Sequence, residues 1–119
     1  MPNDLRQSIE SIRLDVEVVK VSVWPKHSPC VRRLTIDECD LFSARSEGMT
    51  DLQRVCLLCQ LSLCDADGVR CYGDSEEDRA AIGKLDPRAL AEIAAASAQL
   101  NFVTDKAVEA AKKNYAETV

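Results

Sequence analysis

One segment near the middle of the chain, VCLLCQLSLC (55–64), is almost entirely apolar and constrains the fold more than any other. On a helix, at about 100° per residue, Gln53, Arg54 and Gln60 share one narrow polar side. Thr50 and Gln53 form a capping box, which marks a helix start. A helix that is apolar on nearly every side needs neighbours on nearly every side, so we expect it at the centre of the core.

Similar signals predict helices on both sides of this segment. Leu5, Ile9 and Ile12 give helical spacing within the first fourteen residues. Capping residues open the others, namely Thr35 with Glu38, Ser75 with Asp78, Asp86 before Pro87, and Thr104 ahead of the C-terminal segment. We expect Gly48 to end the helix after Thr35, and Gly83, in the left-handed conformation, to end the helix after Ser75.

Two neighbouring segments have the pattern of strands. In LDVEVVKVSVW (14–24), β-branched and polar residues alternate, and a phase slip at Val18–Val19 indicates a bulge or a break. The turn PKHSP (25–29) and the segment CVRRL (30–34) complete a hairpin. We therefore predict an α+β fold, in which an N-terminal β-hairpin packs on a mostly helical body of four to five helices. A single domain is expected over 1–103, with 104–119 as a loosely docked C-terminal helix or tail.

Charge and hydropathy exclude two classes of partner. The net charge is −5, and the only basic cluster, Arg32 and Arg33, is followed at once by acidic residues, so a nucleic-acid partner is not expected. No apolar run approaches the roughly 20 residues of a membrane span, so no membrane association is expected either. Because the N-terminus lacks the apolar region of a signal peptide, we expect a cytoplasmic protein with free thiols.

Four of the six cysteines lie in CLLCQLSLCDADGVRC (56–71), which raises three interpretations. A redox CxxC needs its first cysteine at a helix N-terminus, whereas Cys56 lies inside the predicted helix. Four thiols at Cys56, Cys59, Cys64 and Cys71 would suffice for zinc, but structural sites hold their CxxC pairs in tight turns. We favour the third interpretation, that these cysteines are small hydrophobes in the core. A zinc- or thiol-containing protein stays as an alternative.

No other motif indicates catalysis. DADG (65–68) fails the calcium-loop spacing and is typical of a tight turn. The single histidine, His27, lies in a proline-flanked turn without the residues of a catalytic constellation. The four glycines are scattered at turns, so no phosphate-binding loop exists, and the paired carboxylates lie at helix starts. We therefore predict no catalytic residue, metal or cofactor, and a protein that is not an enzyme.

The order of these segments resembles the tail assembly chaperones of long-tailed (siphovirus-type) phages, prophages and gene-transfer elements. The resemblance runs from about Leu5 to Asn114 and is carried by DLRQSIESIRLDVEVVKVSVWP, VRRLTIDECDLF, LLCQLSLCDADGVRCYGDSEED and IGKLDPRALAEIAAASAQLNFVTDKAVEAAKKN. It implies an α+β protein without catalytic residues that binds the tape measure protein, keeps it soluble and helps to recruit tail tube subunits. It also implies that the protein acts in the host cytoplasm and is absent from the mature virion.

The expected partners are thus the tape measure protein and the tail tube protein, and self-association into a homo-oligomer is left open. A weakly amphipathic C-terminal helix is suited to docking in a partner groove, or on its own core. Its candidate contact residues are Phe102, Val103, Val108 and Tyr115. An acidic protein–protein adaptor domain unrelated to phages is a further alternative.

Overall fold

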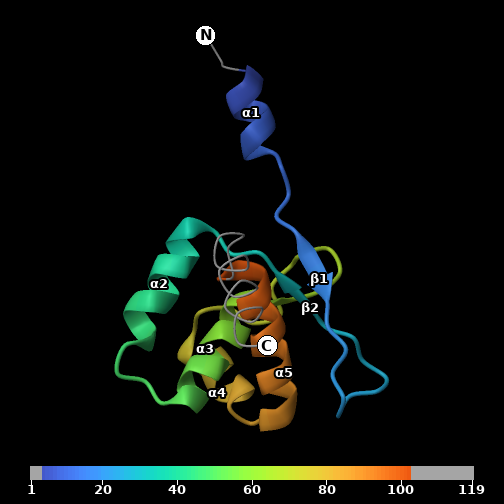
Figure 1. Cartoon of the computed structure of the whole chain (residues 1–119), viewed down its shortest axis with the longest axis vertical. Coiled ribbons are helices and arrows are strands. Elements are labelled where there is room, and N and C mark those ends of the chain that lie inside the picture. Colours follow the sequence, from blue (N-terminus) through green and yellow to red (C-terminus); the bar gives the residue numbers. More distant parts are fainter. Residues whose placement is uncertain (1–3, 103–119) are drawn as a thin grey trace, which may run out of the picture.

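The computed structural model describes residues 4–102, which form an α+β fold (Figure 1). The elements in chain order are α1 (Asp4–Glu10), β1 (Val16–Val18), β2 (Cys30–Arg32), α2 (Ile36–Ser46), α3 (Asp51–Ser62), β3 (Leu63–Cys64), α4 (Glu76–Ile82) and α5 (Pro87–Asn101). The predicted hairpin on a mostly helical body is confirmed. The single domain over 1–103 stays a prediction, and the predicted tail 104–119 lies outside the described residues.

The sheet is antiparallel, with strand order β1-β2-β3. Val16 pairs with Arg32 in the first pair of strands, and Cys30 pairs with Cys64 in the second. The predicted long hairpin is wrong in its extent, because β1 ends at Val18, where the phase slip lies, and residues 19–29 connect it to β2. The chain leaves the sheet there because Ser22 bonds to α5, where its backbone N–H donates to Glu92 Oε2 at 2.7 Å.

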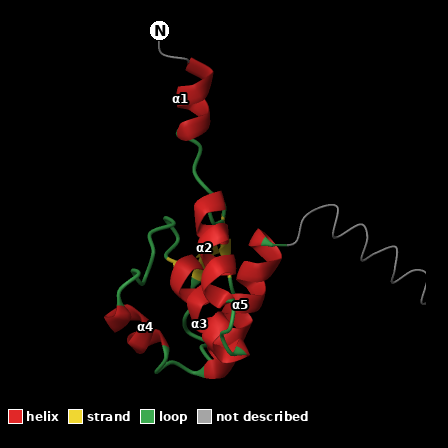
Figure 2. Ribbon diagram, turned by 90° about the vertical axis from the view of Figure 1, so that its left-hand side faces the viewer, coloured by secondary structure: helices red, strands yellow, loops and turns green. Residues whose placement is uncertain are grey.

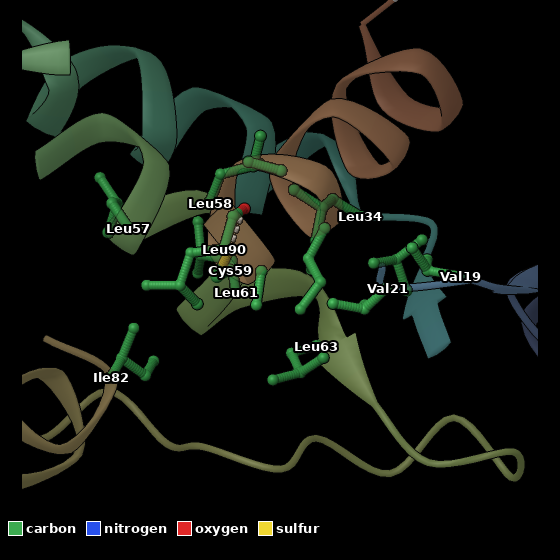
Figure 3. Packing of buried hydrophobic residues seen from close by; sticks show 14 residues of the cluster. Val19, Val21, Leu34, Leu57, Leu58, Cys59, Leu61, Leu63, Ile82 and Leu90 are labelled. Atoms are coloured by element: carbon green, nitrogen blue, oxygen red, sulfur yellow. Dashed lines mark hydrogen bonds between the residues drawn. The ribbon is translucent and has the colours of Figure 1, made fainter. Parts of the chain in front are cut away.

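Helix α3 is the centre of the core, as predicted. Its capping box is complete, since Gln53 N–H donates to Thr50 Oγ1 at 3.2 Å and Thr50 N–H donates to Gln53 Oε1 at 2.9 Å. The six residues from Leu57 to Ser62 are buried. Helix α5 covers one side of α3, and the buried side chains of both helices meet those of β2 and of the loop before it (Figure 3).

Gln60 corrects the expected polar side of α3. The sequence pattern grouped it with Gln53 and Arg54, but its side chain is buried. Its Nε2 donates to the backbone oxygen of Gly73 at 2.8 Å, because the segment after β3 crosses this side of the helix. A buried amide that has a partner stabilises the packing of that segment.

The segment after β3 forms the predicted tight turn. Gly68 has a φ of 83°, and its N–H donates to Asp65 O at 3.0 Å. The turn brings Arg70 back beside Cys64 as an isolated bridge. The start of α4 is confirmed, because Asp78 N–H donates to Ser75 Oγ at 3.1 Å. The predicted left-handed end is wrong, since Gly83 has a φ of −61° and continues the helical conformation.

Candidate partner-binding surfaces

Helix α1 presents an apolar face that the described chain does not cover. Leu5 and Ile9 of α1 expose 67% and 57% of their surface, Ile12 just beyond the helix exposes 69%, and no residue of α1 is buried. The helix extends away from the helical body in both views (Figures 1 and 2). The chain that follows α1 contacts the tight turn of residues 65–68, where Arg13 Nη2 donates to Asp67 O at 2.5 Å. Exposed apolar side chains at helical spacing are typical of a surface that binds a partner.

A second exposed apolar feature lies where α5 ends. Phe102 is the C-cap of α5 and stacks on Phe42 of α2, with ring centroids 5.3 Å apart and planes at 29°. It remains 37% exposed, so it both packs on its own domain and reaches the surface. Phe102 is the one predicted contact residue within the described chain, since Val103, Val108 and Tyr115 lie outside it.

An apolar groove runs between α3 and the segment from α4 to α5. One cavity of about 340 Å³ is lined by Met49, Leu52, Cys56 and Leu57 on one side and by Arg79 and Gly83 on the other. An adjoining cavity of about 180 Å³ shares Leu52, Cys56 and Gly83 with it. The lining of the groove is mainly apolar, so it fits an apolar side chain.

Only some of the cysteines in residues 56–71 are the core residues that the sequence predicts. Cys59 and Cys64 are buried, and burial raises the pKa of the Cys59 thiol to about 12 and that of Cys64 to about 11. The prediction is wrong for Cys71, which is exposed, and Cys56 is half-buried. Cys71 lies outside the apolar helix, in the segment that returns from the turn, so the helical pattern did not apply to it. All six cysteines are free.

The ionisable groups with lowered pKa have structural partners. The Arg70 guanidinium bonds to Asp74 at 2.8 Å and holds the pKa of that carboxyl below its ordinary value. Hydrogen bonds from the Ser22 hydroxyl and backbone do the same for the pKa of Glu92. Within residues 4–102, no three His, Cys, Asp or Glu side chains converge in a way that could hold a metal ion.

His27 lies on the wall of a cavity of about 620 Å³, which Lys26, Cys30 and Tyr72 also line. Among the residues that line this cavity, Asp65 of the tight turn is the one carboxylate, and no second base accompanies His27.

No helix within residues 4–102 has both the length and the apolar character that a membrane span needs.

Comparison of the chain with protein-family models, with curated proteins and with solved structures gives no match. The functional interpretation therefore depends on the chain's own residues. Sequence reasoning placed the contact surface at the C-terminus and did not single out α1. The spacing of Leu5, Ile9 and Ile12 did indicate an apolar face, but spacing alone does not tell whether the rest of the chain covers that face.

Proposed function

We propose that this protein is a non-enzymatic tail assembly chaperone of a long-tailed phage or prophage, which binds the tape measure protein and helps to recruit tail tube subunits in the host cytoplasm. The observation that carries the proposal is an uncovered apolar strip, formed by Leu5 and Ile9 of α1 and by Ile12 just beyond its end. The resemblance of the sequence to this chaperone family supplies the identity of the partner.

The physical case begins with the length of α1. An isolated helix of seven residues is marginal in water, and α1 buries none of its residues against the described body. Docking of its apolar face on a partner would remove these side chains from water and stabilise the helix. A face of this size gives weak binding for one copy. A long partner that binds many copies along its length compensates by avidity.

The charge of the protein suits the same task. A net charge of −5 keeps many copies soluble while they cover an apolar client. An acidic adaptor domain unrelated to phages is the second candidate, because the α1 face supports it equally. The identity of the bound protein separates the two, since an adaptor binds a partner that is not encoded beside a tail gene cluster.

Co-expression with the tape measure protein encoded beside this chain tests the proposal. The triple variant Leu5→Ala/Ile9→Ala/Ile12→Ala removes the apolar face and retains helix propensity. The matched control changes the opposite face, with Gln7→Ala, Glu10→Ala and Ser11→Ala. We expect the first variant to lose capture of the tape measure protein by at least tenfold and the control to retain it. Equal capture by both variants, or no capture by the unaltered protein, would contradict the proposal.

A truncation tests the C-terminal contact that the sequence predicts. Removal of residues 103–119 deletes Val103, Val108 and Tyr115 but leaves α5 and Phe102 in place. If these residues bind the tape measure protein, its capture falls although the folded body keeps its thermal midpoint. Unchanged capture would exclude this segment as a contact and leave α1 as the proposed surface.

A further inference from the structure

Three cysteines from separate parts of the sequence line one cavity. Cys30 of β2, Cys64 of β3 and Cys71 after the tight turn all lie on the wall of the cavity of about 620 Å³. Cys71 is exposed, whereas Cys30 and Cys64 are buried. A small reagent that enters the cavity therefore meets more than one thiol.

Cys30 and Cys64 are also direct partners in the sheet. They are opposite each other in the antiparallel pair of β2 and β3. Residues opposite each other in such a pair have Cα atoms about 4.5–5.5 Å apart and point to the same face. Disulfides span Cα separations of about 4.4–6.8 Å and Cβ separations of about 3.5–4.5 Å. The pair therefore meets the Cα requirement, whereas its Cβ atoms, about 4.5–5.5 Å apart in opposite residues, have to approach by about 1 Å.

We propose that Cys30 and Cys64 form an oxidisable pair, and that a small electrophilic oxidant entering the cavity converts them into a disulfide that joins β2 to β3. The inference does not depend on the proposed function. With an azodicarboxamide as oxidant, one thiol adds across the N=N bond to give an S–N bond. The second thiol attacks that sulfur, the S–N bond breaks, and the S–S bond forms. The hydrazine product carries both protons and both electrons.

The surroundings explain why the pair stays reduced without such a reagent. Burial, together with the neighbouring Cys30 and Cys71, raises the pKa of the Cys64 thiol to about 11. Because the thiolate is the reactive form, oxidation of this thiol at neutral pH is slow, and a reagent in large excess is needed to convert the pair. The pair is thus free in a reducing compartment and couples when an oxidant that reacts with thiols reaches the cavity.

Peptide mapping tests the proposal on the full-length protein. The folded protein is treated with diamide, remaining thiols are blocked with iodoacetamide, and tryptic peptides are sequenced by tandem mass spectrometry. Cleavage after Lys26, Arg32, Arg54, Arg70 and Arg79 places Cys30 in peptide 27–32, Cys64 in peptide 55–70 and Cys71 in peptide 71–79. We expect a linked pair of 27–32 with 55–70, joined at Cys64 and released by dithiothreitol.

Two single variants make the assignment specific. Cys71→Ser is expected to retain the link between 27–32 and 55–70, and Cys30→Ser is expected to abolish it. The linked protein should also have a thermal midpoint about 5 °C above that of the reduced protein, because the disulfide closes a loop of more than thirty residues. A link from 55–70 to 71–79 in place of the expected one, no link in the unaltered protein, or a lower midpoint after linking would overturn the proposal.

Discussion

Helices α3 and α1 carry apolar residues at helical spacing, yet α3 buries six consecutive residues from Leu57 to Ser62 and α1 buries none. Helix α3 contacts α2, α4 and α5, whereas α1 extends away from the body (Figure 1). The two helices also differ in the width of the apolar surface. The apolar surface of α3 surrounds most of the helix, whereas that of α1 is a single strip of Leu5 and Ile9, which Ile12 continues beyond the helix end.

The difference teaches that periodicity locates an apolar face but does not tell what covers it. A helix with apolar residues on most sides has to be enclosed by its own chain, because a partner covers only one side. A helix with one apolar strip can bury that strip equally well against its own core or against another protein. We interpret α3 as the centre of the fold and α1 as a surface for a partner.

The largest expected contrast between the two helices is in thiol reactivity. We compare Cys59 of α3 with the thiol of an Ile9→Cys variant on α1, using iodoacetamide on the folded protein. The pKa of Cys59 is raised from an ordinary value of 9.0 to about 12 by burial, so at pH 8 its thiolate fraction is about a thousandfold lower.

The pH dependence sharpens this measurement. Labelling of Cys59 should rise about tenfold per pH unit up to pH 10, because that range lies below its pKa. Labelling at position 9 should level off above the ordinary thiol pKa. Comparable rates at the two positions at pH 8 would contradict the assignment of α3 to the core.

A matched pair of truncations gives the next largest contrast. Ile93 of α5 is fully buried against α3, and Ile9 of α1 is exposed. Ile93→Ala should lower the free energy of unfolding by about 3 kcal/mol, because it leaves a cavity in the core. Ile9→Ala should change it by less than about 0.5 kcal/mol. Denaturant unfolding of both variants measures the difference, and a loss at position 9 near that at position 93 would show that α1 is part of the fold.

An ion pair joins the sheet to α2 beside the core. Arg32 Nη1 donates to Glu38 Oε1 at 3.0 Å, Arg32 Nη2 also bonds to Glu38, and the side chains are 11% and 22% exposed. Burial alone would raise the pKa of Glu38, but hydrogen bonds from Arg32 and Thr35 outweigh it and lower the pKa below its ordinary value of 4.5.

Because the folded-state pKa of Glu38 is the lower one, its contribution to stability is full above the unfolded pKa and is lost as pH falls through the folded pKa. Glu38→Gln should lower the free energy of unfolding by about 2 kcal/mol at pH 7. The difference between variant and unaltered protein should shrink below about pH 4. Urea unfolding of both proteins at pH 7 and below about pH 4 measures this difference. A difference that grows on acidification would contradict a lowered pKa for Glu38 in the folded protein.

The smallest expected effect concerns the start of α3. Thr50→Ala removes the hydroxyl that accepts from Gln53 N–H and should lower the free energy of unfolding by about 1 kcal/mol. The control is Thr50→Ser, which retains a capping hydroxyl and should change the free energy by a few tenths of a kcal/mol. If Thr50→Ser lowers the free energy of unfolding as much as Thr50→Ala does, the capping hydroxyl does not supply the stabilisation.

The sequence predicted best where a structure depends on residues close along the chain. Thr35 with Glu38 and Thr50 with Gln53 both form complete capping boxes, and Asp86 accepts from Arg88 N–H at the start of α5. Such bonds span two or three residues, so a local pattern contains all the information that they need.

Most of the errors concern contacts between distant segments, the conformation of Gly83 being the local exception. The hairpin was predicted too long because Ser22 bonds to Glu92, and Gln60 was assigned to a polar side because its partner is Gly73. Neither contact leaves a trace in local spacing. The pairing of Cys30 with Cys64 depends likewise on which strand lies beside β2, so the sequence did not indicate that these thiols share a cavity.

Amide hydrogen exchange of the full chain, alone and with the tape measure protein, tests the central claim most directly. In the isolated protein we expect the amides of α3 to exchange only through global unfolding and those of α1 to exchange rapidly. With the partner bound, α1 should gain protection of at least tenfold while α3 changes little. Protection of α1 equal to that of α3 in the isolated protein, or no gain on binding, would contradict the account.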